Sequence, residues 1–408
     1  MKRFFAVLGL LFSFLCIKAK SIDNDIYKIT LSNNIEVILY ENFNSPIITI
    51  GVIYDVGYLD GDKCKFCIGE ITSNLFCDEN TKHIFRENGI NYNVHVYKNH
   101  TELLCKMHPK NLDNALKRIA KRVIATKDIS YLKQQLLIEN NIDKINDSTV
   151  LHDLKCGLLS RDSSSLIFNE DELNNLNNED VYSFLKQYNT CNIRIIICGS
   201  ISYKGLMKSM RNSIHHMHKC NQLKSRETNL NSYKTVYIEG KHRNNAIYLC
   251  YLYSETFAKM QVYFAIFNAL LENKLMGEYQ YIIDYNNEQH DTNLQIISLY
   301  PKFDISLNEL QKIWNVFVLN IINFDLSDVL KNEISMRQKL SENIATTNLD
   351  QIYFLIKNAL LNNIDIKNIF DISSEITKMN SNEFNDISKK ILEKNLLLKI
   401  VEKYRALQ

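Results

Sequence analysis

Runs of apolar residues divide the first part of the chain into short strands and a helix. Residues 35–40 and 47–56 are largely apolar and are separated by a turn that contains Pro46, which predicts two strands with buried faces. Residues 91–97 and 101–107 flank a short polar turn, which predicts a β-hairpin. The stretch between the second strand and the hairpin favours a helix, so the pattern predicts a mixed α/β unit.

The pattern of the first part recurs in the second part. A strand at 101–107 ends before Pro109 and is followed by an amphipathic helix, and a strand at 293–300 ends before Pro301 and a second such helix. In both parts a later helix then leads into an apolar strand. Asn177 caps the first of these later helices, and residues 379–384 open the second. The recurrence indicates two copies of one α/β unit, although coincidence in a chain rich in Ile and Asn is the alternative.

The recurrence predicts a two-domain organisation. The predicted fold class is α/β (α+β), with two homologous halves, each an antiparallel-rich sheet packed with helices. We expect a signal peptide over 1–20, an N-terminal domain over 21–205, a polar connection over 206–231 and a C-terminal domain over 232–408. A chain of 408 residues is too long for one ordinary core and long enough for two.

The start of the chain has the pattern of a secretory signal peptide. Two basic residues precede an apolar run over 4–17, and small residues stand near its end. A run of roughly 14 residues is short for a membrane span of roughly 20, which favours a cleaved leader over an uncleaved anchor. Cys16 would suggest a lipoprotein site, but Leu15 stands where a small residue is expected. We therefore expect secretion to the periplasm or cell envelope.

Charge and cysteine usage narrow the classes of function. The net charge is only +2, which implies no strong electrostatic field for nucleic acid or a membrane. Of ten cysteines, nine would remain after removal of the leader, so at least one stays a thiol or pairs between chains. Cys64 and Cys67 have the spacing of a local disulfide, but two separate thiols are the alternative. Histidines over 215–218 have adventitious metal binding as one interpretation and a solvated loop as the better one.

Several local motifs, in a consistent order, resemble those of the pitrilysin/insulinase family of zinc peptidases. Residues 31–37 are similar to the family's opening strand, with Asn34 in place of the usual glycine. Residues 49–57 resemble its second strand, and residues 88–93 resemble its G-G-x-x-N-A turn. Residues 65–76 resemble the helix that carries the first zinc motif shortly before a Leu-Phe pair. The resemblance covers almost the whole mature chain and implies two α/β halves.

The resemblance also implies that the zinc motif has degenerated. In the family, H-x-x-E-H supplies two zinc-binding histidines and the catalytic glutamate. Aligned on the Leu-Phe pair, the histidine positions hold Gly69 and Ser73, and the glutamate position holds Thr72. The third ligand, a glutamate on a later helix, aligns with Asn140, beside Glu139. The alignment therefore implies no catalytic residue and no zinc cofactor in this chain.

Some members of the family divide the work between two chains, of which the one without the zinc motif supplies an Arg and a Tyr that bind substrate. No Arg lies between Arg243 and Arg337, so that Arg is absent where the resemblance places it. Tyr279, Tyr281 and Tyr285 are candidates for the Tyr, with structural burial as the alternative. The substrate-binding residues of this chain stay unknown.

Together these features predict a catalytically inactive pitrilysin/insulinase-like peptidase homologue, the partner subunit of an active zinc peptidase in the bacterial cell envelope. A peptide or an unfolded protein is the expected class of ligand, and nucleic acid is not. A stand-alone peptide-binding or structural envelope protein is one alternative. An active metallopeptidase that uses unorthodox residues is another.

Overall fold

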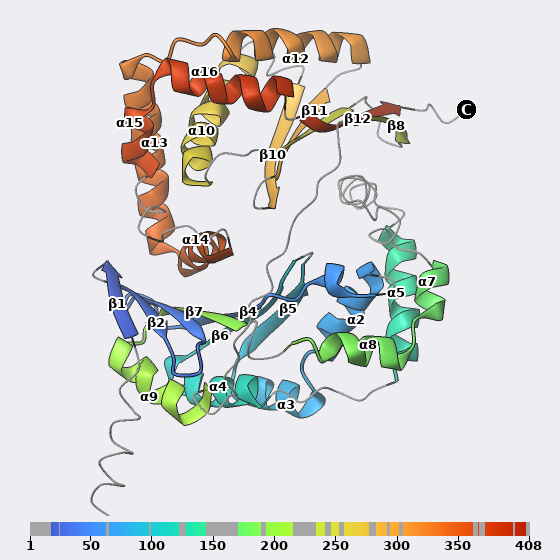
Figure 1. Ribbon diagram of the computed structural model, residues 1–408, viewed down its shortest axis with the longest axis vertical. Helices are drawn as coiled ribbons and strands as arrows, with labels where there is room; N and C mark the ends of the chain where they lie inside the picture. Colours follow the sequence, from blue (N-terminus) through green and yellow to red (C-terminus); the bar gives the residue numbers. More distant parts are fainter. Residues whose placement is uncertain are drawn as a thin grey trace, which may run out of the picture. The chain divides into compact units, whose positions relative to one another are not determined.

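The computed structural model describes residues 18–23, 25–62, 65–97, 99–121, 128–143, 170–188, 193–214, 234–240, 246–252, 257–276, 283–291, 294–301, 305–361, 366, 372–394 and 396–404. These residues form two compact units (Figure 1). Unit 1 contains the described residues of Met1–Ile142, Ser164–Glu227 and Asn348–Phe354. Unit 2 contains those of Asp143–Ser163, Thr228–Thr347 and Leu355–Gln408.

Unit 1 is built on a seven-stranded sheet with the order β1-β2-β3-β7-β4-β6-β5. In this sheet β3 and β7 pair in parallel, and the other neighbouring strands pair antiparallel. The strands are β1 (Lys18–Asp23), β2 (Ile26–Thr30), β3 (Glu36–Glu41), β4 (Ile48–Tyr54), β5 (Asn91–Val96), β6 (Thr101–Met107) and β7 (Ile193–Gly199). The predicted hairpin is confirmed, because Val96 pairs with Thr101 across its turn.

Helices cover one face of this sheet (Figure 1). They are α2 (Lys65–Leu75), α3 (Glu79–Glu87), α4 (Leu112–Ala120), α5 (Ser130–Asp143), α7 (Glu170–Asn175), α8 (Asn178–Leu185) and α9 (Tyr203–Ser213). Short 3-10 turns lie at Tyr58–Asp60 and Pro109–Asn111. In α4 the buried residues are Leu112, Ala115, Leu116 and Ile119, which is the helical spacing of a single apolar stripe. This stripe packs with the apolar strand positions into the core of unit 1.

Unit 2 is built on a five-stranded sheet with the order β10-β11-β9-β12-β8. The strands are β8 (Lys234–Gly240), β9 (Ala246–Leu252), β10 (Ile283–Asp291), β11 (Leu294–Pro301) and β12 (Leu396–Tyr404). The helices are α10 (Phe257–Leu270), α12 (Leu307–Ile321), α13 (Asp328–Thr347), α15 (Ile372–Lys378) and α16 (Ser381–Lys389), with π-helical turns at Leu271–Met276 and Lys390–Lys394. Helix α14 (Leu349–Leu361) begins with residues that belong to unit 1. In the core of unit 2, Tyr263 stacks on Phe267 and Phe384.

The two sheets share one arrangement of strands. The order β5-β6-β4-β7-β3 in unit 1 corresponds to β10-β11-β9-β12-β8 in unit 2, and in both cases only the last pair is parallel among these described strands. Pro109 lies between β6 and α4, and Pro301 ends β11 before α12. The predicted fold class, two α/β halves with antiparallel-rich sheets, is confirmed.

The two predicted capped helices are present at equivalent places. The side chain of Asn177 accepts a hydrogen bond from the backbone N–H of Asp180, and the Asp180 carboxylate accepts one from the N–H of Asn177. The side chain of Asn380 accepts from the N–H of Glu383 at the start of α16. Helix α8 leads to β7 and α16 leads towards β12. Both helices therefore begin at side-chain caps, in the stretches where the sequence predicted that they begin.

Helix α9 and strand β1 lie in segments for which the sequence predicted a polar connection and a signal peptide. Helix α9 occupies the first part of the segment expected as a polar connection, because Leu206, Met207 and Met210 form a buried apolar stripe among its polar residues. Strand β1 begins at Lys18 and pairs with β2, so it includes the end of the expected signal peptide. The preceding residues, 1–17, lie outside the described residues. In the part of the chain that the structure describes, no helix has the length and apolar character of a membrane span.

Asn34 shows why a glycine is the usual residue at the turn before β3. Its φ angle is 69°, in the left-handed region, and it is the one non-glycine residue with a positive φ among those described. Asn tolerates this conformation better than most residues, so it can replace glycine there. The backbone N–H of Asn34 donates to the carbonyl of Leu31 at 2.9 Å, which closes the turn.

Candidate functional site

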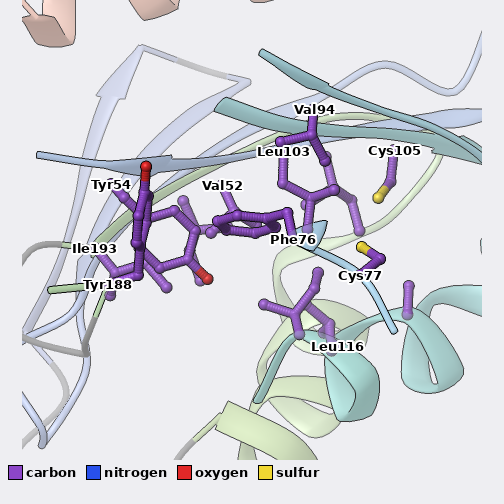
Figure 2. Packing of buried hydrophobic residues seen from close by; sticks show 14 of the residues in the cluster. Val52, Tyr54, Phe76, Cys77, Val94, Leu103, Cys105, Leu116, Tyr188 and Ile193 are labelled. Atoms are coloured by element: carbon purple, nitrogen blue, oxygen red, sulfur yellow. The ribbon is translucent and has the colours of Figure 1, made fainter. Parts of the chain in front are cut away.

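The helix that aligns with the zinc motif is α2, and an aromatic cluster fixes its C-terminal end in the core of unit 1. The Phe76 ring lies 5.4 Å from the ring of Tyr54 and 5.2 Å from the ring of Tyr188, both edge-on (Figure 2). The Thr101 hydroxyl is 2.8 Å from the Tyr188 hydroxyl and donates to the carbonyl of Val56 at 2.7 Å. The Leu-Phe pair that marks the family motif is therefore a core anchor that orients the helix.

Gly69, at the first histidine position, lies where α2 comes close to its neighbours. The residue is buried, and an added Cβ would lie 3.2 Å from the Cβ of Tyr58 and 3.5 Å from the Cγ1 of Val96 on β5. The first of these contacts is tighter than ordinary van der Waals packing. A larger residue at this position therefore requires Tyr58 to move.

The other two motif positions on α2 hold hydroxyl groups with different surroundings. Thr72 is fully buried, and its hydroxyl has no hydrogen-bond partner among the described residues. The Ser73 hydroxyl donates to the carbonyl of Glu70 at 2.7 Å, one turn earlier in the same helix. Asn74 donates to that same carbonyl at 3.2 Å. The polar groups at this end of α2 are thus directed into its own backbone or the protein interior.

Two carboxylates from different helices lie near the motif positions. Glu70 stands on the exposed side of α2. Surrounding protein that displaces water raises the pKa of its carboxyl above the ordinary 4.5, and the negative charge of Glu139 on α5 raises it further. Glu139 accepts a hydrogen bond from Gln135 at 2.7 Å. The structure therefore brings α5, the helix aligned with the third zinc ligand, close to α2. Asn140 lies on α5, and its side chain is outside the described residues.

A buried carboxylate on β6, which the sequence analysis did not single out, lies on the other face of the sheet. Glu102 is 3% exposed and accepts hydrogen bonds from the hydroxyls of Tyr97, at 3.2 Å, and Tyr353. Tyr353 belongs to the segment Asn348–Phe354 of unit 1. Its ring occupies the space left by Gly51 on β4, where an added Cβ would lie 1.8 Å from the hydroxyl oxygen. The missing side chain of Gly51 thus makes room for the tyrosine.

The chemistry of this cluster is that of hydrogen-bond donors around a carboxylate. Burial, and then the charge of Glu102, raises the pKa of both Tyr97 and Tyr353, so both hydroxyls keep their protons and act as donors. Lys106 on the same strand forms an ion pair with Asp350 at 2.6 Å. The one sequence signal for this cluster was Glu102, a charged residue at the start of an apolar strand. Its partner Tyr353 is 251 positions away, and no local sequence pattern links the two residues.

The residues at the motif positions do not fit a catalytic zinc ion. Such an ion needs imidazole or carboxylate ligands and a carboxylate base beside a bound water. Gly69 has no side chain, the Thr72 hydroxyl is buried, and Ser73 is bonded to its own helix. Within the described ranges, no group of three or more His, Cys, Asp or Glu side chains is arranged to hold a metal ion.

Several residues that the sequence singled out cannot be placed. Tyr279, Tyr281 and the histidines over 215–218 lie outside the described residues, and so does the side chain of Tyr285 on β10. Cys67 is disulfide-bonded, but Cys64 is outside the described residues. The predicted pairing of Cys64 with Cys67 therefore stays a prediction.

Solved structures of other proteins share the fold of this chain. No family model and no curated protein sequence matches the chain. Among solved structures, the periplasmic protease PqqL from Escherichia coli superposes with a TM-score of 0.77 at 13% identity, covering 94% of this chain and 46% of that one. This chain therefore spans about half the length of that protease.

Two other solved structures match over their whole length. A protease from Helicobacter pylori has a TM-score of 0.78 at 14% identity, covering 95% of this chain and 100% of that one. A peptidase M16 inactive domain from Pseudomonas fluorescens has a TM-score of 0.73 at 12% identity, covering 97% and 100%. At these identities the likeness concerns the fold, and this chain has the pitrilysin-like fold of the M16 peptidases.

Proposed function

We propose that this chain is a catalytically inactive pitrilysin-like protein that pairs with an active zinc peptidase of the same fold in the bacterial cell envelope. The observation that carries the proposal is the state of α2. The helix keeps the core anchor at Phe76 and its place against β5, yet Gly69, Thr72 and Ser73 stand where zinc ligands and base are needed. A helix that keeps its packing but lacks the metal-binding side chains is expected in a homologue that has lost catalysis.

The length of the chain supports pairing with a second chain. It corresponds to 46% of PqqL, so one such protease contains about two chains of this length. A chain with two halves would enclose only part of the chamber that the family usually forms. The shared strand order of the two sheets supports an origin of these halves by internal duplication. A second two-halved chain, carrying H-x-x-E-H, is the complement that this account requires.

An envelope location agrees with the start of the sequence. A basic and then apolar N-terminus has the pattern of a secretory signal. PqqL, which shares the fold, is a periplasmic protease. A disulfide at Cys67 also fits an oxidising compartment better than a reducing one.

Co-purification from native envelope extract tests the pairing. A tagged full-length chain is expressed in the bacterium that encodes it, captured, and separated by size under native conditions. We expect a second pitrilysin-like chain with an intact H-x-x-E-H motif to elute with it in a stoichiometric complex that cleaves peptides. The matched control is an unrelated periplasmic protein with the same tag. Elution of the chain alone, at the mass of a monomer, would instead favour a stand-alone envelope protein.

A further inference from the structure

Two buried cysteines of unit 1 lie together in its core. Cys105 is on β6 and is fully buried, and Cys77 follows the end of α2 and is 6% exposed. Figure 2 shows their sulfur atoms pointing toward one another, between the sheet and the helix that carries Leu116. Both are thiols in this structure. They come from different elements and are separated along the chain by the whole of α3 and β5.

The electrostatics of the two thiols agree with this proximity. Burial raises the pKa of the Cys105 thiol, and the neighbouring Cys77 raises it further. Cys198, a third buried thiol, serves as a contrast, since burial alone raises its pKa. Tyr92, which pairs with Cys105 across the hairpin, has its pKa raised mainly by burial, with both Cys77 and Cys105 contributing. The pKa values of Cys105 and Tyr92 thus both respond to Cys77, which agrees with the arrangement of the sulfur atoms in Figure 2.

The backbone on both sides of Cys77 is held in place. Phe76 is fixed in the aromatic cluster, and the Asp78 side chain accepts a hydrogen bond from the N–H of Thr81 at 2.9 Å, which caps α3. Cys77 and Asp78 also line a small cavity, together with Thr81 and Arg118. Both thiols are buried in the folded core, so the exchange takes place while the chain folds.

We propose that Cys77 and Cys105 form a disulfide when the protein folds in an oxidising compartment, in addition to the disulfide at Cys67. The Cys77 thiolate attacks a disulfide of a thiol–disulfide oxidoreductase, or of oxidised glutathione, and one thiolate leaves. The Cys105 thiolate then attacks the sulfur of Cys77 in this mixed disulfide and releases the second thiolate. The two protons lost by the cysteine thiols are taken up by the two leaving thiolates, and two electrons pass from the cysteine sulfurs to the reagent disulfide, which becomes two thiols. The bond ties the end of the motif helix α2 to the sheet.

Peptide mapping of the wild-type chain tests the proposal. The full chain is refolded in a buffer of oxidised and reduced glutathione, remaining thiols are alkylated under denaturing conditions, and the protein is digested with trypsin and a glutamate-specific protease. Cleavage after Glu70 separates Cys67 from Cys77. We expect residues 71–79 to be joined to residues 103–106, and Cys198 to be alkylated. Alkylation of both Cys77 and Cys105, or linkage of Cys77 to another cysteine, overturns the proposal.

A thermal measurement adds a second readout. Reduction is expected to lower the melting temperature of the wild type by about 5–10 °C more than that of Cys105→Ser, because the closed loop restricts the unfolded chain. Equal shifts in both proteins would contradict the bond. The formation of this disulfide in cells rests on the proposed envelope location, whereas its formation in a glutathione buffer does not. A link that forms in glutathione but is absent from protein taken from cells supports the pair and counts against the location.

Discussion

At the scale of single residues, Glu70 makes the motif region sensitive to pH. Its pKa is raised in the folded protein, first by displaced water and then by Glu139. An acid with a raised pKa stabilises the fold below its unfolded pKa, and this contribution is lost as the pH rises through the folded value. We therefore expect Glu70→Gln to raise the urea midpoint at pH 7, by an amount that disappears well below pH 4.5.

Gly51 gives a prediction about packing on the face of the sheet that carries Glu102. In Gly51→Ala the new Cβ would overlap the Tyr353 ring, displace its hydroxyl from Glu102 and leave a buried carboxylate with one fewer donor. We expect a loss of about 1–3 kcal/mol in the free energy of unfolding, measured in urea. In Gly205→Ala on α9 the nearest contact is the Ser202 side-chain oxygen at 3.3 Å, against 1.8 Å at Gly51, so that variant should lose much less stability. An unchanged midpoint for Gly51→Ala would contradict the placement of Tyr353.

Sequence reasoning reached some of these residues and missed others for physical reasons. The resemblance to the family's opening strand placed Asn34 at the usual glycine position, and its φ of 69° agrees with that place. The contact between Gly51 and Tyr353 joins residues about 300 positions apart, and such pairs leave no periodic pattern in the sequence. The interaction of Glu70 with Glu139 depends on how two helices pack, which their separate patterns do not define.

At the scale of elements, the caps of α8 and α16 should contribute alike. Asn177→Ala and Asn380→Ala each remove the side-chain acceptor for an N–H in the first helical turn. We expect each substitution to lower the free energy of unfolding of its own unit by about 1 kcal/mol. Asn177→Ser and Asn380→Ser keep an acceptor and should lose much less. Hydrogen exchange resolved along each helix measures the effect, and unchanged protection in both alanine variants would contradict the capping.

Restoring the zinc ligands tests the alignment of α2. Gly69→His, Thr72→Glu, Ser73→His and Asn140→Glu place both imidazoles four positions apart, on one face of the helix. Because Gly69 packs on Tyr58, the set should bind zinc better with Tyr58→Ala added. We expect metal binding with little turnover, since the surrounding groups that orient ligands in an active enzyme have no reason to persist. If the folded variants bind zinc no better than the wild type, the alignment of this helix is wrong.

The order of elements was more predictable than their boundaries. Pro109 and Pro301 interrupt strand patterns in the same way, so the equivalent strands and helices could be identified from local signals. Helix α9 was expected to be part of a polar connection, because its buried residues Leu206, Met207 and Met210 are spread among polar ones. Burial against α4 determines this helix, and that contact is not visible in the local sequence.

At the scale of the whole molecule, a duplicated pattern in the sequence corresponds to two sheets with the same strand order. The fold could be predicted because each half repeats the same strand and helix signals, and solved structures of pitrilysin-like peptidases share it. The function is harder to predict, because the proposal depends on the alignment of α2 with the family's zinc motif. In that alignment Gly69, Thr72 and Ser73 stand at the positions of two zinc ligands and the catalytic base.

The zinc content of the purified full-length chain tests most directly whether this protein lacks a catalytic zinc site. Elemental analysis after dialysis, together with a peptide-hydrolysis assay, is carried out on the wild type and on a variant in which His215, His216 and His218 are replaced by alanine. The account predicts no stoichiometric zinc and no hydrolysis by either protein. About one tightly bound zinc per chain, retained in the variant and accompanied by peptide turnover, would contradict it.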